Sequence, residues 1–324
     1  MKSFEYAAPK TLKEATALLS DSWGRTEVLA GGTDLVTSLK QRVTQPNRVV
    51  SLKNIKDLKG IDSSKGALRI GAMTTLGELT ANKSVREKFP ALVAAAEGIG
   101  SPQLLSVGTV GGDLCQRPRC WYFRNGFGLL GQKDGASLVR EGDNRYHAIF
   151  GNDGPALFVS VSSLGPALFA LGAEITVAGP GAKTRNIPIA EFFRTPRNES
   201  ERETALKPNE IVTEISVPAK GLKNATYEVR HRHGLDWPYV TATVAFQLKG
   251  GAVSDARIVL GHVAPVPWLA GAASSALNNT AVSETSATKC AEAAAQGAKP
   301  LGGNAYKVQM VKAAVKRAVL AAVA

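Results

Sequence analysis

Paired glycines stand in two stretches of this chain, Leu29-Ala30-Gly31-Gly32-Thr33-Asp34-Leu35 and Val107-Gly108-Thr109-Val110-Gly111-Gly112-Asp113. Each follows apolar sequence and adds a threonine and an acidic residue to the glycines. Glycine permits φ > 0 and brings peptide N–H groups close to a ligand. Successive N–H groups in such a turn form a nest for phosphate oxygens, and the threonine hydroxyl can donate one more hydrogen bond. Two such loops predict a clamp on the pyrophosphate of a dinucleotide.

The two loops do not match the better-known phosphate motifs. No G-x-x-x-x-G-K-S/T segment is present, which excludes a P-loop. No G-x-G-x-x-G opens a helix after a first strand, which excludes a Rossmann fold. Between the loops, segment 68–79 predicts a short strand, a turn and a helix in which Thr75 and Glu78 have capping-box spacing.

The chain resembles the FAD-binding subunit of bacterial molybdenum hydroxylases, the xanthine dehydrogenase and aldehyde dehydrogenase group. Segment 116–124, QRPRCWYFR, is similar to the branch whose FAD subunit also carries a [4Fe–4S] cluster. The resembling segments span nearly the whole chain in family order, so the resemblance is specific. They are AGGTD at 30–34, IGAMTTLGEL at 70–79, GTVGGD at 108–113, PALFALGAEI at 166–175, KPNEIVTEISVP at 207–218 and VRHRHGLDWPYV at 229–240.

This resemblance implies an α+β protein with a two-part FAD-binding domain of the vanillyl-alcohol-oxidase and CO-dehydrogenase-flavoprotein type. That domain is expected over residues 1–220, with subdomains at about 1–55 and 56–220. A smaller α+β domain like the C-terminal domain of CO dehydrogenase flavoproteins is expected over 221–324. The implied function is to pass electrons from the [2Fe–2S] clusters of a small partner subunit through FAD to an acceptor. A large partner subunit would bind molybdopterin and oxidise the substrate.

The same resemblance implies a set of FAD-binding residues, and it implies neither a catalytic residue nor a metal ligand in this chain. These residues are Leu29, Ala30, Gly31, Gly32, Thr33, Asp34, Leu35, Gly71, Thr74, Gly108, Thr109, Gly111, Gly112, Asp113, Ser163 and Glu228.

Four positions depart from the family pattern. Leu105-Ser106 replaces the usual Arg-Asn, and Asp113 replaces an asparagine. An unpaired carboxylate at Asp113 would repel a diphosphate. Ser163 stands where an aspartate of the family contacts FAD, and Glu228 aligns with an expected lysine. We therefore expect weaker FAD binding than in typical relatives.

The cysteines depart further from the cluster-bearing branch. A cubane cluster takes four thiolate ligands as a rule. Of the four cysteines in those relatives only Cys120 remains, while Cys115 is additional and Cys290 lies far away. The other three places are taken by Leu129, Ser137 and Ala156. The sequence predicts that this chain holds no [4Fe–4S] cluster of its own.

The net charge of +12 invites a nucleic-acid hypothesis. However, lysines and arginines are scattered without a dense run, which favours solvated surface and an acidic partner subunit instead. The apolar stretches are too short for a membrane span. The N-terminus MKSFEYAAPK has no apolar core of a signal peptide. The cytoplasm is therefore expected, or the periplasm by co-export with a signal-bearing partner.

The periodicity predicts the remaining elements. A long glycine-rich excursion occupies 126–154 and a linker 218–224, and the tail 304–323 has the helical period. Gly250-Gly251 indicates a hairpin. Helices are expected at 11–19 and 84–99, and strands at 28–30, 49–52, 167–178, 227–248 and 252–263.

Other polar and aromatic residues allow more than one interpretation. His231 and His233 could suggest a metal site, but no third ligand stands nearby and arginines flank them, so a basic strand is favoured. Trp237 and Tyr239 either flank a flavin or belong to the core. The three arginines of the QRPRCWYFR segment either neutralise FAD phosphates, grip a partner or face solvent. They are Arg117, Arg119 and Arg124.

Three alternative functions stay open. The departures and missing cysteines favour a degenerate structural subunit that binds FAD weakly or not at all, whereas the retained loop glycines argue against it. A self-sufficient FAD reductase of the vanillyl-alcohol-oxidase group, or a nucleic-acid-binding module, is further from the pattern. The substrate is expected to be an aldehyde, or alternatively an N-heterocycle. The electron acceptor stays open among NAD, quinone, cytochrome and oxygen.

Overall fold

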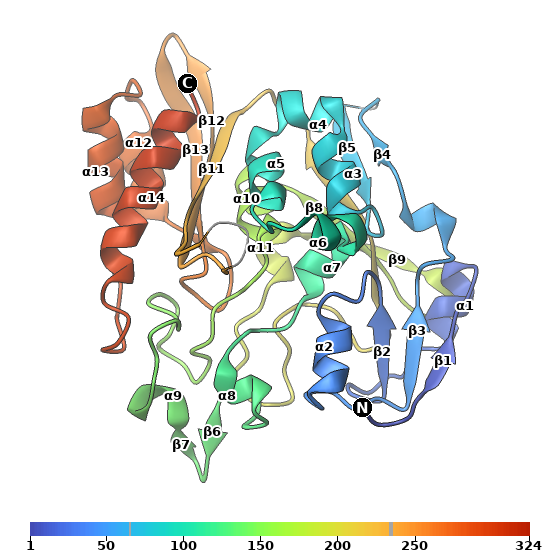
Figure 1. Ribbon diagram of the computed structural model, residues 1–324. Helices are drawn as coiled ribbons and strands as arrows, with labels where there is room; N and C mark the ends of the chain where they lie inside the picture. The colour runs from blue at the N-terminus through green and yellow to red at the C-terminus, as the bar shows by residue number, and fades with distance from the viewer. Residues whose placement is uncertain (65, 233–235) are drawn as a thin grey trace.

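A small parallel sheet forms the N-terminal part of the computed structural model, which describes residues 1–64, 66–232 and 236–324 (Figure 1). Its strand order is β1 (Glu5–Ala7), β3 (Arg48–Ser51) and β2 (Thr26–Leu29), flanked by helices α1 (Leu12–Ala17) and α2 (Leu35–Lys40). The predicted capping box of α1 is confirmed, because Thr11 Oγ1 accepts from the Glu14 N–H at 3.2 Å and Glu14 accepts in return. Loop 30–34 joins β2 directly to α2.

A five-stranded antiparallel sheet follows, and helices from the first half of the chain pack against it. Its order is β4 (Ile61–Asp62), β5 (Ala67–Gly71), β10 (Ile211–Pro218), β8 (Glu174–Ala178) and β9 (Thr184–Pro188). The helices share one apolar core with this sheet. They are α3 (Leu76–Ala81), α4 (Lys83–Lys88), α5 (Pro90–Glu97), α6 (Pro102–Val107), α7 (Val110–Cys115), α10 (Leu164–Leu171) and α11 (Ile189–Phe192).

The third sheet contains β11 (Lys223–Val229), β12 (Val240–Lys249), β13 (Ala252–Gly261) and β14 (Trp268–Leu269). Helices α12 (Gly271–Leu277), α13 (Glu284–Ala294) and α14 (Lys307–Ala321) form a layer on one face, while α5 and α10 contact the other (Figure 1). The hairpin at Gly250-Gly251 is confirmed, and both glycines have positive φ, +57° and +83°.

The strand predicted at 167–178 is wrong in its first half, which belongs to helix α10. A short apolar run does not distinguish a buried helix from a buried strand. The helix forms because the Leu164 N–H at its start donates to Asp113, and Gly172 ends it at φ +74°. The helix predicted at 84–99 is likewise split into α4 and α5 at Phe89-Pro90.

The boundaries predicted around the third sheet also shift. The strand expected over 227–248 is two strands, because β11 ends at Val229 and β12 begins at Val240. The linker is shorter than expected, since β10 runs to Pro218 and β11 begins at Lys223.

The excursion after the second loop contains α8 (Trp121–Arg124), β6 (Gln132–Lys133), β7 (Ala136–Ser137) and α9 (Leu138–Glu141). Its segment 144–152 is fastened to the start of α14. Asn304 donates to the His147 carbonyl at 3.1 Å, and the buried Lys307 ammonium donates to the carbonyls of Tyr146 at 2.9 Å and His262 at 2.8 Å. Among the described residues, no helix is both long enough and apolar enough to span a membrane.

Candidate functional site

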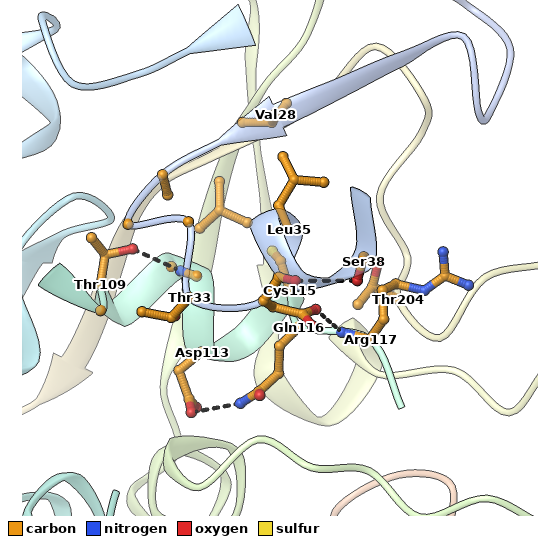
Figure 2. Close-up of a pocket in the computed structure, with 18 of the residues that line it drawn as sticks. Val28, Thr33, Leu35, Ser38, Thr109, Asp113, Cys115, Gln116, Arg117 and Thr204 are labelled. Carbon is orange, nitrogen blue, oxygen red and sulfur yellow. Dashed lines mark hydrogen bonds between the residues drawn. The ribbon is translucent and has the colours of Figure 1, made fainter. Parts of the chain in front are cut away.

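The two glycine-rich stretches line one cavity of about 550 Å³. Figure 2 shows Thr33, Thr109 and Asp113 around it. Segments 202–212 and 236–238, which are distant in sequence, complete the wall. The structure therefore brings most of the predicted residues to a single site. The predicted residues in the lining are Ala30, Gly31, Gly32, Thr33, Asp34, Leu35, Gly108, Thr109, Gly111, Gly112, Asp113 and Ser163.

The two stretches touch each other at Gly31. A Cβ atom on Gly31 would lie 2.0 Å from the Val107 carbonyl oxygen and 2.8 Å from the Val107 carbonyl carbon. Of the four loop glycines Gly31, Gly32, Gly111 and Gly112, only Gly32 has positive φ, at +86°. Close backbone approach, rather than φ > 0, is therefore what requires glycine at Gly31.

The second stretch is the start of a helix and not the tight turn that the sequence suggested. Thr109 caps α7 by accepting from the Gly112 N–H at 3.1 Å. A Cβ on Gly111 would lie 2.8 Å from the Cβ of Ala72, so this glycine lets α7 pack against the turn after β5. The segment between the loops also contributes to the cavity wall through Ala72, Met73 and Leu76. Its capping box, Thr75 with Glu78, is confirmed.

The first loop offers free backbone donors to the cavity. Within the described residues, no acceptor pairs with the N–H groups of Gly32, Thr33 or Asp34. Successive free N–H groups suit an anion. This geometry agrees with the nest predicted from the sequence at this loop.

Asp34 fixes the arginines of the QRPRCWYFR segment beside this loop. Its carboxylate accepts from Arg119 at 2.5 Å, from Arg124 at 2.9 Å and from the Arg117 N–H at 2.8 Å. Burial alone would raise the pKa of Asp34, but Arg119, the Arg117 N–H and Arg124 together hold it below its ordinary value. Asp34 is thus a permanent anion that orients the arginines.

Two of these arginines keep donors free. Arg117 and Arg119 line the cavity, and Arg124 lies behind them. The buried Arg117 Nη2 and Arg119 Nε have no partner within the described residues. The other contacts of these two side chains hold them in place: Arg117 Nε donates to Glu203 at 2.7 Å, and the Arg119 guanidinium lies 5.1 Å from the Trp237 ring centroid. Free buried donors of this kind suit phosphate oxygens.

Asp113 is paired, so the condition on which it was expected to repel a diphosphate is not met. Its oxygens accept from Ser162 Oγ at 2.5 Å, from Gln116 Nε2 at 2.9 Å and from the N–H groups of Ser163 and Leu164. Burial raises the pKa of Asp113, and these donors oppose the rise. The carboxylate thus joins α7 to the start of α10, and Ser163 contacts it through its backbone.

Four predicted residues lie outside the lining, namely Leu29, Gly71, Thr74 and Glu228. Gly71 allows close approach of the chain, because a Cβ there would lie 2.4 Å from the Leu58 carbonyl oxygen. Thr74 Oγ1 bonds both the N–H and the carbonyl of Gly60. Glu228 is buried behind Arg230, which does line the cavity.

Sequence reasoning missed the wall formed by the end of the 193–210 connection. Arg202 lies over the Trp23 ring at 5.0 Å, and both side chains line the cavity. The only signal nearby was KPNEIVTEISVP, which was used for the resemblance and not for the site. Trp237 lines the cavity, whereas Tyr239 lies outside it and stacks on Tyr146.

The cysteines and histidines lie in unremarkable surroundings for metal binding. Cys120 packs in an apolar cluster with Leu129 and Ala156, and its sulfur lies 3.2 Å from His147 Nε2. Burial raises the pKa of the Cys120 thiol. His231 is exposed, and His233 lies outside the described residues. Across residues 1–64, 66–232 and 236–324, no three His, Cys, Asp or Glu side chains gather as a metal site.

Comparisons with known proteins match both halves of the chain. Residues 2–220 match the FAD binding domain in molybdopterin dehydrogenase, and residues 225–322 match the CO dehydrogenase flavoprotein C-terminal domain. The carbon monoxide dehydrogenase medium chain of Hydrogenophaga pseudoflava is 31% identical, over 98% of this chain and 96% of the relative. The aldehyde oxidoreductase FAD-binding subunit PaoB of Escherichia coli K12 is 30% identical, over 87% of this chain and 88% of the relative.

Solved structures give the same result. A chain of the reconstituted CO dehydrogenase from Oligotropha carboxidovorans is 26% identical with a TM-score of 0.77, covering 99% of this chain and 97% of that one. The H. pseudoflava enzyme gives a TM-score of 0.76 over 98% of this chain and 96% of that one. The expected family and its two-part FAD-binding fold are confirmed. The chain belongs to the FAD-binding medium subunits of the molybdenum hydroxylases, which makes it an oxidoreductase flavoprotein subunit.

Proposed function

We propose that this chain holds FAD in the 550 Å³ cavity and relays electrons through it within a heteromeric molybdenum-dependent dehydrogenase. The observation that carries the proposal is the set of unpaired donors on one wall: the N–H groups of loop 32–34 with Arg117 Nη2 and Arg119 Nε. A diphosphate supplies acceptors of the matching charge. Bound FAD would supply the redox chemistry, accepting electrons from a partner and passing them on.

The residues of this chain would bind and orient the cofactor. Loop 32–34 and the two arginines would hold the diphosphate, and Asp34 would keep the arginines aimed at it. The apolar side chains of Ala72, Met73 and Leu76 would exclude water from the cavity. No residue of this chain is assigned to the organic substrate, which a partner would bind.

The partners are proposed by similarity. A large subunit would carry molybdopterin and a small subunit the [2Fe–2S] clusters, and this chain would hold no cluster of its own. The relatives named above act on carbon monoxide or aldehydes, and a nicotinate dehydrogenase FAD-subunit of Eubacterium barkeri is 39% identical over 35% of this chain. An aldehyde or an N-heterocycle is therefore proposed as substrate class. The cytoplasm, or the periplasm by co-export, stays the proposed compartment.

The proposed function is tested on the chain purified with its native partners, by absorbance with flavin and iron counted per chain. We expect one flavin per chain and no iron beyond that of the partner clusters. A complex that lacks flavin would contradict the relay and favour the structural-subunit alternative. Iron and acid-labile sulfide in the isolated chain would contradict the cluster-free prediction.

Arg119→Ala tests the phosphate-binding wall directly. Loss of its free donor and charge should weaken FAD binding roughly tenfold or more, as for charge-assisted hydrogen bonds. The dissociation constant is measured by flavin fluorescence on the isolated chain. Arg197→Ala is the matched control, because Arg197 is paired with Glu201 in an exposed salt bridge and is absent from the cavity lining. Equal losses in both variants would refute the assignment.

A further inference from the structure

Glu228 is a buried acid that the proposed binding site does not use. It stands near the end of β11, and its side chain is 10% exposed. One carboxylate oxygen pairs with Arg230, and the other, Oε1, is buried with no partner within the described residues. The backbone is shaped around this carboxylate, because a Cβ on Gly98 would lie 2.3 Å from Glu228 Oε2.

Arg230 connects Glu228 to the cavity. Its side chain is 4% exposed and forms part of the cavity wall, as does Gly98. Arg230 Nη1 donates to the Gly98 carbonyl at the end of α5, at 2.5 Å. The guanidinium is thus fixed, and its charge cannot move away. The net charge of the pair is zero when Glu228 is ionised and positive when Glu228 is protonated.

The groups facing Glu228 set the pH at which this change occurs. Burial is the largest cause and raises the pKa of Glu228 to about 7, Arg230 lowers it, and Asp113 from α7 raises it. From the neighbouring strand β12, the uncharged Thr241 stands opposite Glu228. Behind Thr241, burial lowers the pKa of His262 to about 3, so this imidazole stays neutral. Glu228 is therefore the group of this cluster that changes charge near neutrality.

We propose that Glu228 is a positioning residue that controls, through Arg230, the charge of the cavity wall, so that the chain binds FAD more tightly below neutral pH than above it. This inference rests on the proposed function, since it requires FAD in the cavity. FAD is an anion through its diphosphate, and a unit charge about 10 Å away in a partly solvated site changes its binding by roughly 1 kcal/mol. That energy corresponds to about a fivefold change in affinity.

The test measures the dissociation constant of FAD by flavin fluorescence at about pH 6 and about pH 8, the window in which Glu228 titrates. We expect the wild-type constant to rise roughly fivefold at the higher pH. Glu228→Gln should keep the tighter value at both. Glu214→Gln is the control, because it removes a carboxylate that pairs with Arg69 at 3.3 Å outside the cavity, and it should behave as wild type.

A second measurement needs no cofactor and covers the case in which Glu228→Gln folds poorly. The infrared band of a protonated carboxyl group should disappear from the wild-type chain as the pH rises through neutrality. Tight FAD binding that is independent of pH would overturn this inference and leave the proposed function intact. Absence of FAD binding at both pH values would overturn the proposed function, and the inference with it.

Discussion

Gly31→Ala is expected to separate the two cofactor loops and abolish tight FAD binding. The added Cβ would lie 2.0 Å from the Val107 carbonyl oxygen and 3.2 Å from the Gly108 Cα. Both neighbours are backbone atoms, so no side-chain rotation relieves the overlap. Overpacking of this kind costs about 3 kcal/mol. We expect a lower melting temperature and a dissociation constant for FAD at least tenfold higher, a loss of about 1.4 kcal/mol.

Gly154→Ala is the matched control. A Cβ on Gly154 meets no atom within 4 Å, and Gly154 is not among the glycines with positive φ. The same chemical change should therefore leave both melting temperature and FAD affinity close to wild type. If Gly31→Ala behaved in the same way, the loop contact would not be needed for the cavity.

Asp34→Asn should be nearly as damaging, because it removes the carboxylate on which two guanidinium groups and one N–H converge. Breaking a buried ion pair costs about 3–5 kcal/mol, since the remaining charges stay buried without compensation. The Asp34 side chain is 16% exposed, so solvent compensates little of this loss. Urea unfolding at neutral pH should show the decrease, and FAD binding should weaken as Arg119 loses its orientation.

The pH dependence gives a second readout for Asp34. Its folded pKa lies below the ordinary 3.8, so its contribution is complete above that value and disappears as the pH falls through the folded pKa. The stability difference between wild type and Asp34→Asn should therefore shrink in acid. Asp143→Asn is the control: Asp143 pairs with Arg145 at 2.8 Å, but the pair is exposed, and its removal should change little. A constant difference at all pH values would contradict this role for Asp34.

Local signals in the sequence predicted local structure well. The capping boxes at Thr11 and Thr75 and the hairpin at Gly250-Gly251 depend on neighbouring residues, and all three are present. The helix α10 was taken for a strand because its start depends on Asp113, about fifty residues away, as the acceptor for its first N–H groups. An interaction at that separation leaves no periodic trace in the chain.

The site was predictable only where it coincides with motifs. The loop at 30–35 and the stretch at 108–113 are recognisable by their glycines, and both line the cavity. The opposite wall, with Trp23, Arg202 and Arg230, comes together only through the packing of three sheets. Gly71 and Thr74 show the converse, because residues within a motif can serve the backbone of the turn instead of the cavity.

The attachment of segment 144–152 to the start of α14 affects the order in which the protein matures. Lys307 and Asn304 are among the last residues to leave the ribosome, yet they hold the carbonyls of Tyr146 and His147, downstream of the arginines that face the cavity. Until the final helix has been synthesised, the segment that carries Arg117 and Arg119 lacks this anchor. Cofactor loading therefore belongs after translation, and a chain truncated before α14 would leave the ribosome with its first loop formed and its arginine wall unfastened.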